Sequence, residues 1–414
     1  MLYSTPFITM AFANLCTVAS FGTFYLFPLF IISRGGSESD IGIIMGAFAL
    51  SAVLCRPWVS EMIDRIGRKR SYTVGCAILA ILPLTYLLFH GDLSQFYVPL
   101  IIVRILHGIG LAICFTTAFT YIADIVPKGR LNEGIGMFGV TGLTGLALGP
   151  ALGEIIIRNY GFSLFFLTAS GMAILGFILH LKLPESFAGE HDELSQSFFS
   201  VFRFRRITIV VLLAFLFGIA LAASSSFVSP FAKEQDIAFI SLYFIAYSSA
   251  AVITRLLGGR LADRIGEYRI IPFALVLTGG GLFALTLLGG NMLLIFSGIM
   301  SGCGHGFLFP SLNSLAVRHV PVAMRGKITG AFTGGIDAGA FAGSITLGYI
   351  GEWAGYRALF ATAGAGLLLG LGICRRGLAK EGLPTASGRA ETEGAAGEER
   401  KTRTYLLHDL KKGG

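Results

Sequence analysis

Apolar residues in this 414-residue chain gather in long blocks, and short polar or charged stretches separate the blocks. A helix of about 20 apolar residues is long enough to cross the hydrocarbon core of a bilayer. Six such blocks precede a polar stretch at 186–206, and six follow it. The pattern predicts an all-α polytopic membrane protein with twelve transmembrane helices in two six-helix bundles. The predicted helices are residues 7–32, 41–62, 72–90, 95–121, 134–157, 162–183, 207–231, 238–261, 270–289, 292–317, 327–350 and 357–374.

The pattern also divides the chain into regions. We expect an N-terminal bundle at 1–185, a cytoplasmic linker at 186–206, a C-terminal bundle at 207–376 and a tail at 377–414. The tail is rich in Gly, Ala, Glu, Lys and Arg and has few large apolar residues. Such a segment cannot bury enough apolar surface to fold, so we predict that it is disordered and cytoplasmic. A short amphipathic helix at 404–412 on the membrane surface is the alternative.

Composition and the placement of charge support a membrane protein and give its orientation. Hydrophobic residues make up 54% of the chain and charged residues 14%, too few for the surface of a soluble protein. The net charge of +8 does not point to nucleic acid, because most Lys and Arg lie in loops between apolar blocks. Without the tail, loops on one side of the predicted membrane hold 16 basic residues and loops on the other side hold 4. Basic loops remain in the cytoplasm, so both termini are predicted to be cytoplasmic in a multi-pass protein of the cell membrane.

An internal repeat links the two predicted bundles. A segment that begins with Arg, continues for seven residues and ends in Asp-Arg-Ile-Gly occurs once in each half, 199 residues apart. Chance does not readily give this pattern twice at equivalent places, so the halves are related by duplication and pseudo-symmetric. The two copies run from Arg56 to Asp64-Arg65-Ile66-Gly67 and from Arg255 to Asp263-Arg264-Ile265-Gly266.

Three motifs resemble those of the major facilitator superfamily, and the resemblance covers about residues 5–376. Residues 64–69, Asp-Arg-Ile-Gly-Arg-Lys, resemble the signature loop of that family, although Ser60 stands where the family pattern has glycine. Arg104 and the residues after it resemble the Arg-containing motif of the fourth helix. The Gly149-Pro150 pair resembles a motif of the drug and metabolite efflux branches. The resemblance implies two bundles that rock about a central site and expose it to each side in turn.

The signature loop and the Gly-Pro motif supply the candidate gating residues. A carboxylate among cations at the end of a helix can lock one conformation and release it in another. Glycines spaced four apart let helices approach closely, as a sliding interface between halves requires. The alternative is a packing motif without a gating role, and for the glycines the two readings stay equally open. The candidate gating residues are Asp64, Arg65, Gly67, Arg68, Asp263, Arg264, Gly149 and Pro150.

Two charged residues inside predicted helices are candidates for proton coupling. Arg56 and Asp337 lie at similar depths from the cytoplasmic ends of their helices. The resemblance implies that these two helices are neighbours, so we expect an ion pair. Buried charges in a membrane are costly and mark functional sites. Protonation of Asp337 would release Arg56 and shift the conformational equilibrium; a static buried pair is the alternative.

Polar residues in the helices that the resemblance assigns to the cavity are candidates for substrate binding. Arg104 and His107 share one helix face, and His305 lies at comparable depth in the other half. Such a set would favour an anion; the alternative is that the histidines are hydrogen-bonded packing residues. Arg255 is expected to bond backbone carbonyls or to extend to the membrane surface. The full set of predicted substrate-binding residues is Arg104, His107, Asn14, Thr17, Tyr121, His305 and Ser225.

No catalytic, metal-binding or cofactor-binding motif is present in the sequence, and no phosphate-binding loop for ATP hydrolysis occurs. We therefore expect a monomeric secondary transporter whose partners are a small-molecule substrate, a proton or other coupling ion and the lipid bilayer. Proton-coupled export of a metabolite or drug is the preferred reading. Proton-coupled uptake of an organic anion and a membrane sensor without transport are the alternatives.

Overall fold

The computed structural model describes residues 2–127, 130–186, 198–317 and 322–378, and every regular element within these ranges is a helix. The predicted tail lies almost wholly outside the described residues, so its predicted disorder stays a prediction. The same holds for most of the predicted linker, of which 187–197 is not described.

The described residues of the first part of the chain include six α-helices and the short 3-10 turns η1 and η2. The first apolar block is not one uniform helix, because the turn η1 separates α1 from α2 just before Pro28. The elements are α1 (Thr5–Thr23), η1 (Phe24–Leu26), α2 (Phe27–Ser33), α3 (Glu38–Ile66), α4 (Arg68–Thr85), η2 (Tyr86–Leu88), α5 (Leu93–Ile125) and α6 (Leu131–His180).

The second part repeats this arrangement, with a π-helical segment in place of the turn inside its first span. A π-segment widens the helix by one residue and often marks a functional site. The elements are η4 (Phe198–Arg203), α7 (Arg205–Ala222), η5 (Ala223–Phe227), α8 (Val228–Glu234), α9 (Ser241–Ile265), α10 (Glu267–Leu285), α11 (Asn291–Val317) and α12 (Val322–Leu378).

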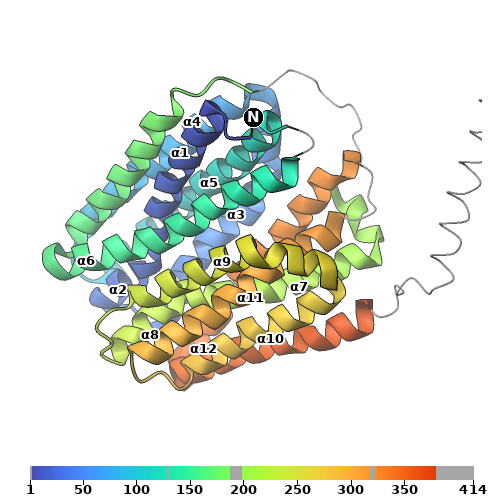
Figure 1. The fold of residues 1–414 in the computed structure, drawn as a ribbon. Coiled ribbons are helices and arrows are strands. Elements are labelled where there is room, and N and C mark those ends of the chain that lie inside the picture. The colour runs from blue at the N-terminus through green and yellow to red at the C-terminus, as the bar shows by residue number, and fades with distance from the viewer. Residues whose placement is uncertain (1, 128–129, 187–197, 318–321, 379–414) are drawn as a thin grey trace, which may run out of the picture.

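Ten helices in the described residues are long and apolar enough to cross a membrane. Two of them, Glu133–His180 and Lys327–Arg376, are 48 and 50 residues long, more than twice the length that one crossing needs. Each contains one glycine with a positive φ, 79° at Gly161 and 82° at Gly355. At this glycine α6 turns back on itself, so that its two arms run in opposite directions (Figure 1).

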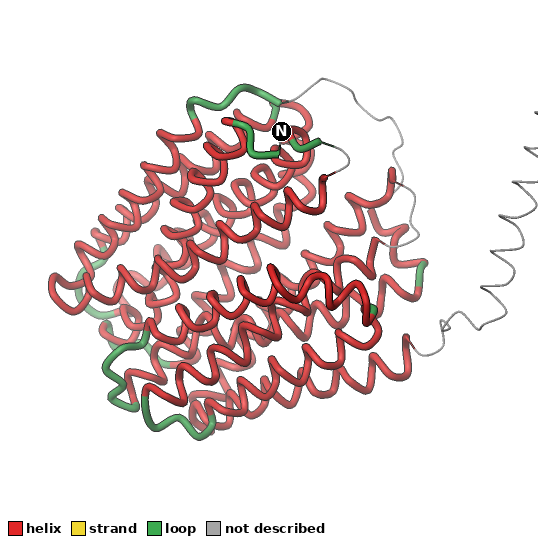
Figure 2. The backbone as a smooth tube through the Cα atoms, in the orientation of Figure 1, coloured by secondary structure: helices red, strands yellow, loops and turns green. Residues whose placement is uncertain are grey.

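The helices gather in two groups, which we call the first half (α1–α6) and the second half (α7–α12) (Figures 1 and 2). Within the halves, α6 packs along α1 and α12 packs along α7. Between the halves, α3 packs against α12 and α6 packs against α9. These two helix pairs form the walls between which a central cavity lies.

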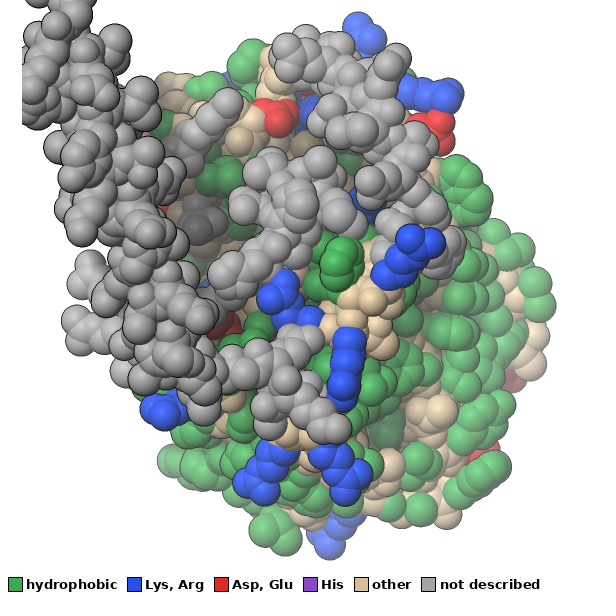
Figure 3. All heavy atoms as spheres, turned by 90° about the vertical axis from the view of Figure 1, so that its right-hand side faces the viewer, with side chains coloured by type: hydrophobic (Ala, Val, Ile, Leu, Met, Phe, Trp, Pro, Cys, Tyr) green, Lys and Arg blue, Asp and Glu red, His purple; other side chains and the backbone are tan. Residues whose placement is uncertain are grey.

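Basic side chains gather on one face of the molecule, where α6 begins and α12 ends. Figure 3 views this face, and Lys and Arg outnumber Asp and Glu on the described part of it. We call it the basic face. The opposite face holds the connections between α2 and α3, between α8 and α9, and the turns at Gly161 and Gly355.

Candidate functional site

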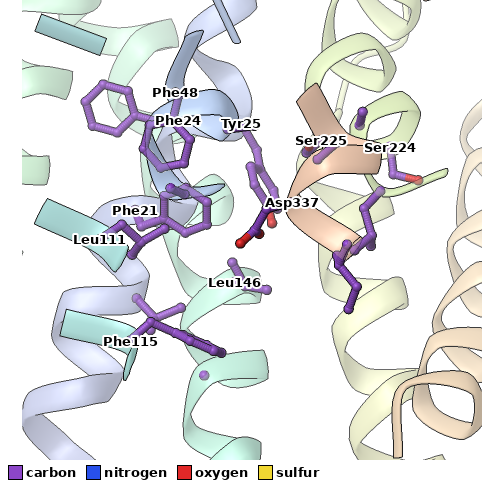
Figure 4. A pocket seen from close by; sticks show the side chains of 18 of the residues that line it. Phe21, Phe24, Tyr25, Phe48, Leu111, Phe115, Leu146, Ser224, Ser225 and Asp337 are labelled. Carbon is purple, nitrogen blue, oxygen red and sulfur yellow. The ribbon is translucent and has the colours of Figure 1, made fainter. Parts of the chain in front are cut away.

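A cavity of about 330 Å³ lies between the two halves. Small-molecule sites are typically of this size or larger, about 300–1,000 Å³. Helices α1, α5, α7 and α11 contribute to its walls, and so do α3, α6, α9 and α12. Phe21, Phe48 and Leu111 lie on one side, Ser225 lies on the other, and the Asp337 carboxylate lies between them (Figure 4).

Aromatic rings make up much of the cavity wall. Phe21 and Phe48 stack with ring centroids 5.5 Å apart. Tyr25 of the first half meets Phe244 of the second half at 5.2 Å. Rings placed in this way offer flat apolar surfaces to a solute and gain from contact with another ring.

Arg56 and Asp337 form an ion pair across the two halves, as their matching depths led us to expect. Nε of Arg56 donates a 2.8 Å hydrogen bond to Oδ2 of Asp337, and Nη2 bonds the same oxygen. Both side chains line the cavity and keep about a quarter of their surface accessible, 22% for Arg56 and 25% for Asp337. Water or a solute in the cavity can therefore reach the pair.

Arg104 lines the cavity from α5 and is fully buried. Its guanidinium lies 4.6 Å from the centroid of the Phe48 ring and 5.1 Å from that of Phe27. One Nη atom contacts the sulfur of Met45 at 3.3 Å, while Nε and Nη1 have no hydrogen-bond partner among the described residues. Aromatic faces stabilise this cation in place of a carboxylate.

Three of the predicted substrate-binding residues lie away from the cavity. His107 contacts the Tyr86 hydroxyl at 3.4 Å and packs against the ring of Phe24. The Thr17 hydroxyl lies 3.2 Å from that of Tyr72, and the Tyr121 hydroxyl donates to the backbone oxygen of Pro184 at 3.2 Å. These side chains bind helices to one another within the first half, so the proposed site below does not include them.

The remaining predicted residues do line the cavity. Asn14 donates to the Thr141 hydroxyl at 2.9 Å and faces the cavity from α1. Ser225 faces it from the π-segment η5, together with its two neighbouring serines. His305 faces it from α11, and its Nδ1 is hydrogen-bonded to the hydroxyl of Tyr247.

Arg255 differs from the expectation. It neither extends to the membrane surface nor bonds a carbonyl among the described contacts, and instead lines the cavity beside His305, with 3.4 Å between Nη2 and Nε2. Its guanidinium lies 5.4 Å from the ring centroid of Phe309. The interpretation of Arg255 as an extended surface side chain is therefore wrong. The internal repeat could have predicted that Arg255 faces the cavity, because it corresponds to Arg56, which faces the same cavity.

The signature loop forms a charged cluster at the basic face. Nε of Arg68 lies 3.0 Å from Oδ2 of Asp124, and its Nη1 lies 3.2 Å from Oδ1 of Asp64. A carboxylate oxygen of Glu185, which the sequence did not single out, accepts the backbone N–H of Arg68 at 2.8 Å. Arg65 stands apart from this cluster and pairs with Glu61 one turn earlier. The cluster thus joins α3, α4, α5 and the segment after α6.

The repeat of this loop has the same backbone. Gly67 has φ 95° and ψ 164°, and Gly266 has φ 85° and ψ 150°. The side chains of Asp263 and Arg264 lie outside the described residues. Their predicted gating role stays a prediction.

The Gly149-Pro150 motif lies within one half. A Cβ atom at Gly149 would lie 2.7 Å from the backbone nitrogen of Thr23, and one at Gly22 would lie 3.5 Å from the ring of Pro150. The glycines of α6 therefore hold it close to α1, its neighbour in the first half. Of the two readings that the sequence left open for these glycines, their contacts with α1 agree with a packing motif inside one half.

Buried hydrogen bonds also join the two halves near the face opposite the basic one. Glu154 of α6 is buried, and its two carboxylate oxygens accept the backbone N–H groups of Ile240 and Ser241, each at 2.8 Å. Ser229 donates to the backbone oxygen of Tyr25 at 2.7 Å. These bonds join the two halves at that face, and residue types alone do not reveal them because each bond involves a backbone group.

Comparison with known proteins decides the family. The family model of the Major Facilitator Superfamily matches residues 10–333 and 210–408. The chain belongs to this superfamily. It is similar to an uncharacterized MFS-type transporter of Methanocaldococcus jannaschii, 26% identical over 353 residues that cover 80% of this chain and 88% of that protein.

Two further likenesses agree with this assignment. The multidrug resistance protein MdtG of Proteus mirabilis is 24% identical over 353 residues, which cover 80% of this chain and 85% of that protein. The crystal structure of the D323A mutant of the nucleoside transporter NupG has the same fold, with a TM-score of 0.72 and 15% identity over 91% of this chain and 99% of that one. The chain is thus a multi-pass transporter of the cell membrane and not an enzyme.

Proposed function

We propose that the protein is a secondary active transporter that moves a small organic solute by alternating access. The observation that carries this proposal is the cavity between the halves, closed at one face by bonds such as those of Glu154. Two halves that rock about such a cavity open it first to one side and then to the other. In this proposal α6 and α12 each cross the membrane twice, which gives twelve crossings in two bundles, 1–185 and 207–376.

The conformation described is then open toward the cytoplasm. The basic face would be cytoplasmic, as basic loops are, and both termini with it. The Arg68 cluster at this face would act in gating, because it ties α4 and α5 to α3, the helix that packs against α12 of the second half. A monomer suffices, since one chain supplies both halves.

The Arg56–Asp337 pair would couple transport to protons. Asp337 lies on α12 and Arg56 on α3, so the pair crosses the interface that must rearrange. A proton on Asp337 would remove the charge that holds Arg56 and would lower the energy of the state in which the halves have moved. A proton gradient would thereby drive the cycle.

Export of an amphipathic solute is the preferred direction. The aromatic walls of the cavity suit a solute with a ring-containing or otherwise apolar body, and relatives such as MdtG are named for drug resistance. An organic anion is a second candidate, taken up or exported, because three arginines (Arg56, Arg104 and Arg255) and one carboxylate (Asp337) line the cavity.

The test uses purified protein in liposomes that enclose a pH-sensitive dye. Pooled organic acids and pooled cationic amphiphiles are applied in turn to wild type, Asp337→Asn and Arg104→Ala. Proton movement that depends on one pool and is lost in both variants supports coupled transport of that class. Solute uptake without proton movement in the wild type would rule out proton coupling while leaving transport in place.

A further inference from the structure

Among the described side chains Arg255 has no counter-ion, whereas its symmetry mate has one. It corresponds to Arg56 in the internal repeat, 199 residues apart, and both arginines line the same cavity. We propose that Arg255, together with Tyr247, forms the binding subsite for a carboxylate group of the solute. This inference rests on the proposed function and deepens it, since it assigns the solute class to monocarboxylates with an apolar body.

The symmetry breaks at the helix that faces each arginine. Arg56 of α3 faces Asp337 of α12, whereas Arg255 of α9 faces Gly139 of α6. A Cβ atom built on Gly139 would lie 2.9 Å from Nη1 of Arg255. None of the ion pairs formed by the described side chains includes Arg255. The protein therefore neutralises one of the two related charges and leaves the other for a ligand.

The surroundings of Arg255 leave donors available. An arginine has five N–H donors and no acceptor. Its 3.4 Å contact to His305 Nε2 makes that ring nitrogen the acceptor and occupies one donor. The Nε atom has no hydrogen-bond partner among the residues that the structure describes. Arg255 also lines the cavity, and a planar guanidinium there can bind a carboxylate through two parallel bonds.

His305 lies between Arg255 and Tyr247 and determines which way the hydrogen bond to Tyr247 runs. Because Nε2 accepts from Arg255, the proton of the neutral ring lies on Nδ1, which is hydrogen-bonded to the Tyr247 oxygen. In this arrangement the Tyr247 oxygen accepts, and its own hydrogen is free for another acceptor. Tyr247 also lines the cavity. A bound carboxylate can thus meet the guanidinium at the Nε2 side of the His305 ring and the hydroxyl donor at its Nδ1 side.

The rest of the cavity limits the solute to an apolar body. The Phe309 ring lies under the guanidinium, with 5.4 Å between Cζ of Arg255 and the ring centroid. Aromatic side chains such as Phe21 and Phe48 line the side of the cavity opposite Ser225 (Figure 4). A volume of about 330 Å³ admits a body of about two rings. A charged cavity wall without a counter-ion is costly in a membrane protein, and a carboxylate from the solute removes that cost.

The test measures binding of two probes of the same shape to purified protein in lipid nanodiscs. The probes are 1-naphthoate, which carries a carboxylate, and 1-naphthalenemethanol, which carries a neutral hydroxymethyl group. Wild type is expected to bind naphthoate at least tenfold more tightly, because the carboxylate adds charge-assisted hydrogen bonds. Arg255→Gln is expected to reduce this preference to less than threefold.

A second pair of variants tests the symmetry argument without removing the arginine. Gly139→Asp supplies the missing carboxylate from α6, and the contact it creates is with the far end of a flexible side chain, which can adjust. The protein then neutralises Arg255 itself, so the preference for naphthoate is expected to disappear. Gly139→Asn adds a side chain of the same size without the charge and is expected to keep most of the preference. The two Gly139 variants test the carboxylate subsite even if Arg255→Gln does not fold.

The outcomes separate this inference from the proposed function. Loss of the preference in Gly139→Asp and its retention in Gly139→Asn support the subsite. A wild type without the preference, or Arg255→Gln and Gly139→Asp with the preference intact, overturns it. Naphthoate-driven proton movement in liposomes, measured on the same preparations, tests transport separately. A protein that binds naphthoate through Arg255 and moves neither solute nor proton would keep the subsite and disprove the transporter.

Discussion

Nε of Arg56 lies 2.8 Å from Oδ2 of Asp337, although 281 residues separate them in the chain. Their hydrogen bond joins α3 to α12 and so joins the first half to the second. The pair is accessible from the cavity, so its charge state can respond to a proton or a solute. A buried pair closed off from the cavity would have only a structural effect.

Asp337→Asn is expected to reduce substrate-driven proton movement in liposomes at least tenfold. The amide keeps the shape and can still accept a bond from Arg56, but it cannot take up and release a proton. Binding of the solute is expected to change much less than the flux, which equilibrium binding to the same protein measures. Asp236→Asn is the matched control, because Asp236 is exposed near the face opposite the basic one. Unchanged proton movement in Asp337→Asn would exclude this residue as the carrier.

Loss of one partner of the pair is expected to cost more stability than loss of both. Arg56→Gln leaves the Asp337 carboxylate without its partner in a largely buried place. Asp337→Asn likewise leaves the Arg56 guanidinium without its counter-ion. For fully buried pairs the cost is about 3–5 kcal/mol, and partial exposure of this pair reduces it to about 1–3 kcal/mol. The double variant is expected to unfold at a higher temperature than Arg56→Gln alone. Additive losses in a double-mutant cycle would show that the two charges are not coupled.

The sequence predicted the spans and the central pair because these follow from long-range regularities. Apolar blocks of spanning length located most of the helices, and the repeat located Gly67 and Gly266 at equivalent turns. Arg56 forms an ion pair with Asp337, as the matching depths of the two residues indicated. The folded-back elements α6 and α12 each contain two of the predicted spans, and a glycine with a positive φ, Gly161 or Gly355, lies between the two.

The direction in which a side chain points could not be predicted in the same way. His107 and Thr17 share their helices with cavity residues, but each points toward a neighbouring helix of its own half. A helix that lines a cavity shows it only one face, and several charged or polar positions are compatible with either face. The contact of Glu154 could not be predicted for a different reason. Its partners are backbone N–H groups at the start of α9, and any residue type can supply such a group.

Gly149→Ala is expected to destabilise the first half. The added Cβ would lie 2.7 Å from the backbone nitrogen of Thr23 and would force α6 away from α1. Overpacking of this kind costs about 1–3 kcal/mol, and backbone atoms cannot move aside as a side chain can. Thermal unfolding in detergent measures the change. Gly171→Ala, on the other arm of α6, adds a Cβ with nothing within 4 Å and is expected to leave stability unchanged.

Gly67→Ala and Gly266→Ala separate backbone strain from crowding. Both glycines have a φ that other residues rarely adopt, 95° and 85°, so each substitution is expected to cost about 1–2 kcal/mol. At Gly67 a Cβ would also lie 2.6 Å from a carboxylate oxygen of Glu185, whereas at Gly266 nothing lies within 4 Å. Gly67→Ala is therefore expected to lower the unfolding temperature more than Gly266→Ala. The opposite order would show that the Glu185 contact is not maintained in the membrane.

Glu154→Gln is expected to open the cavity at the face opposite the basic one. The carboxylate accepts two backbone N–H groups of the second half, at Ile240 and Ser241, and a carboxylate is favoured at the start of a helix. The amide can accept only one of these bonds and turns its own N–H₂ toward the other N–H. Hydrogen bonds to a charged group contribute about 1.5–3 kcal/mol each, so the loss of one shifts the balance between conformations about tenfold or more.

Labelling of a single introduced cysteine measures this shift. Ser225→Cys, in a chain whose six native cysteines are replaced by Ser, places a thiol on the cavity wall. A membrane-impermeant maleimide applied to the face with the 34–37 and 235–240 connections is expected to react about tenfold faster after Glu154→Gln. Glu352→Gln is the matched control, since the described contact of Glu352 to the first half is a 3.3 Å bond from the Ser37 hydroxyl at an exposed position. Exposed contacts of this kind contribute little, so equal acceleration by both variants would contradict the view that the buried Glu154 holds the halves together.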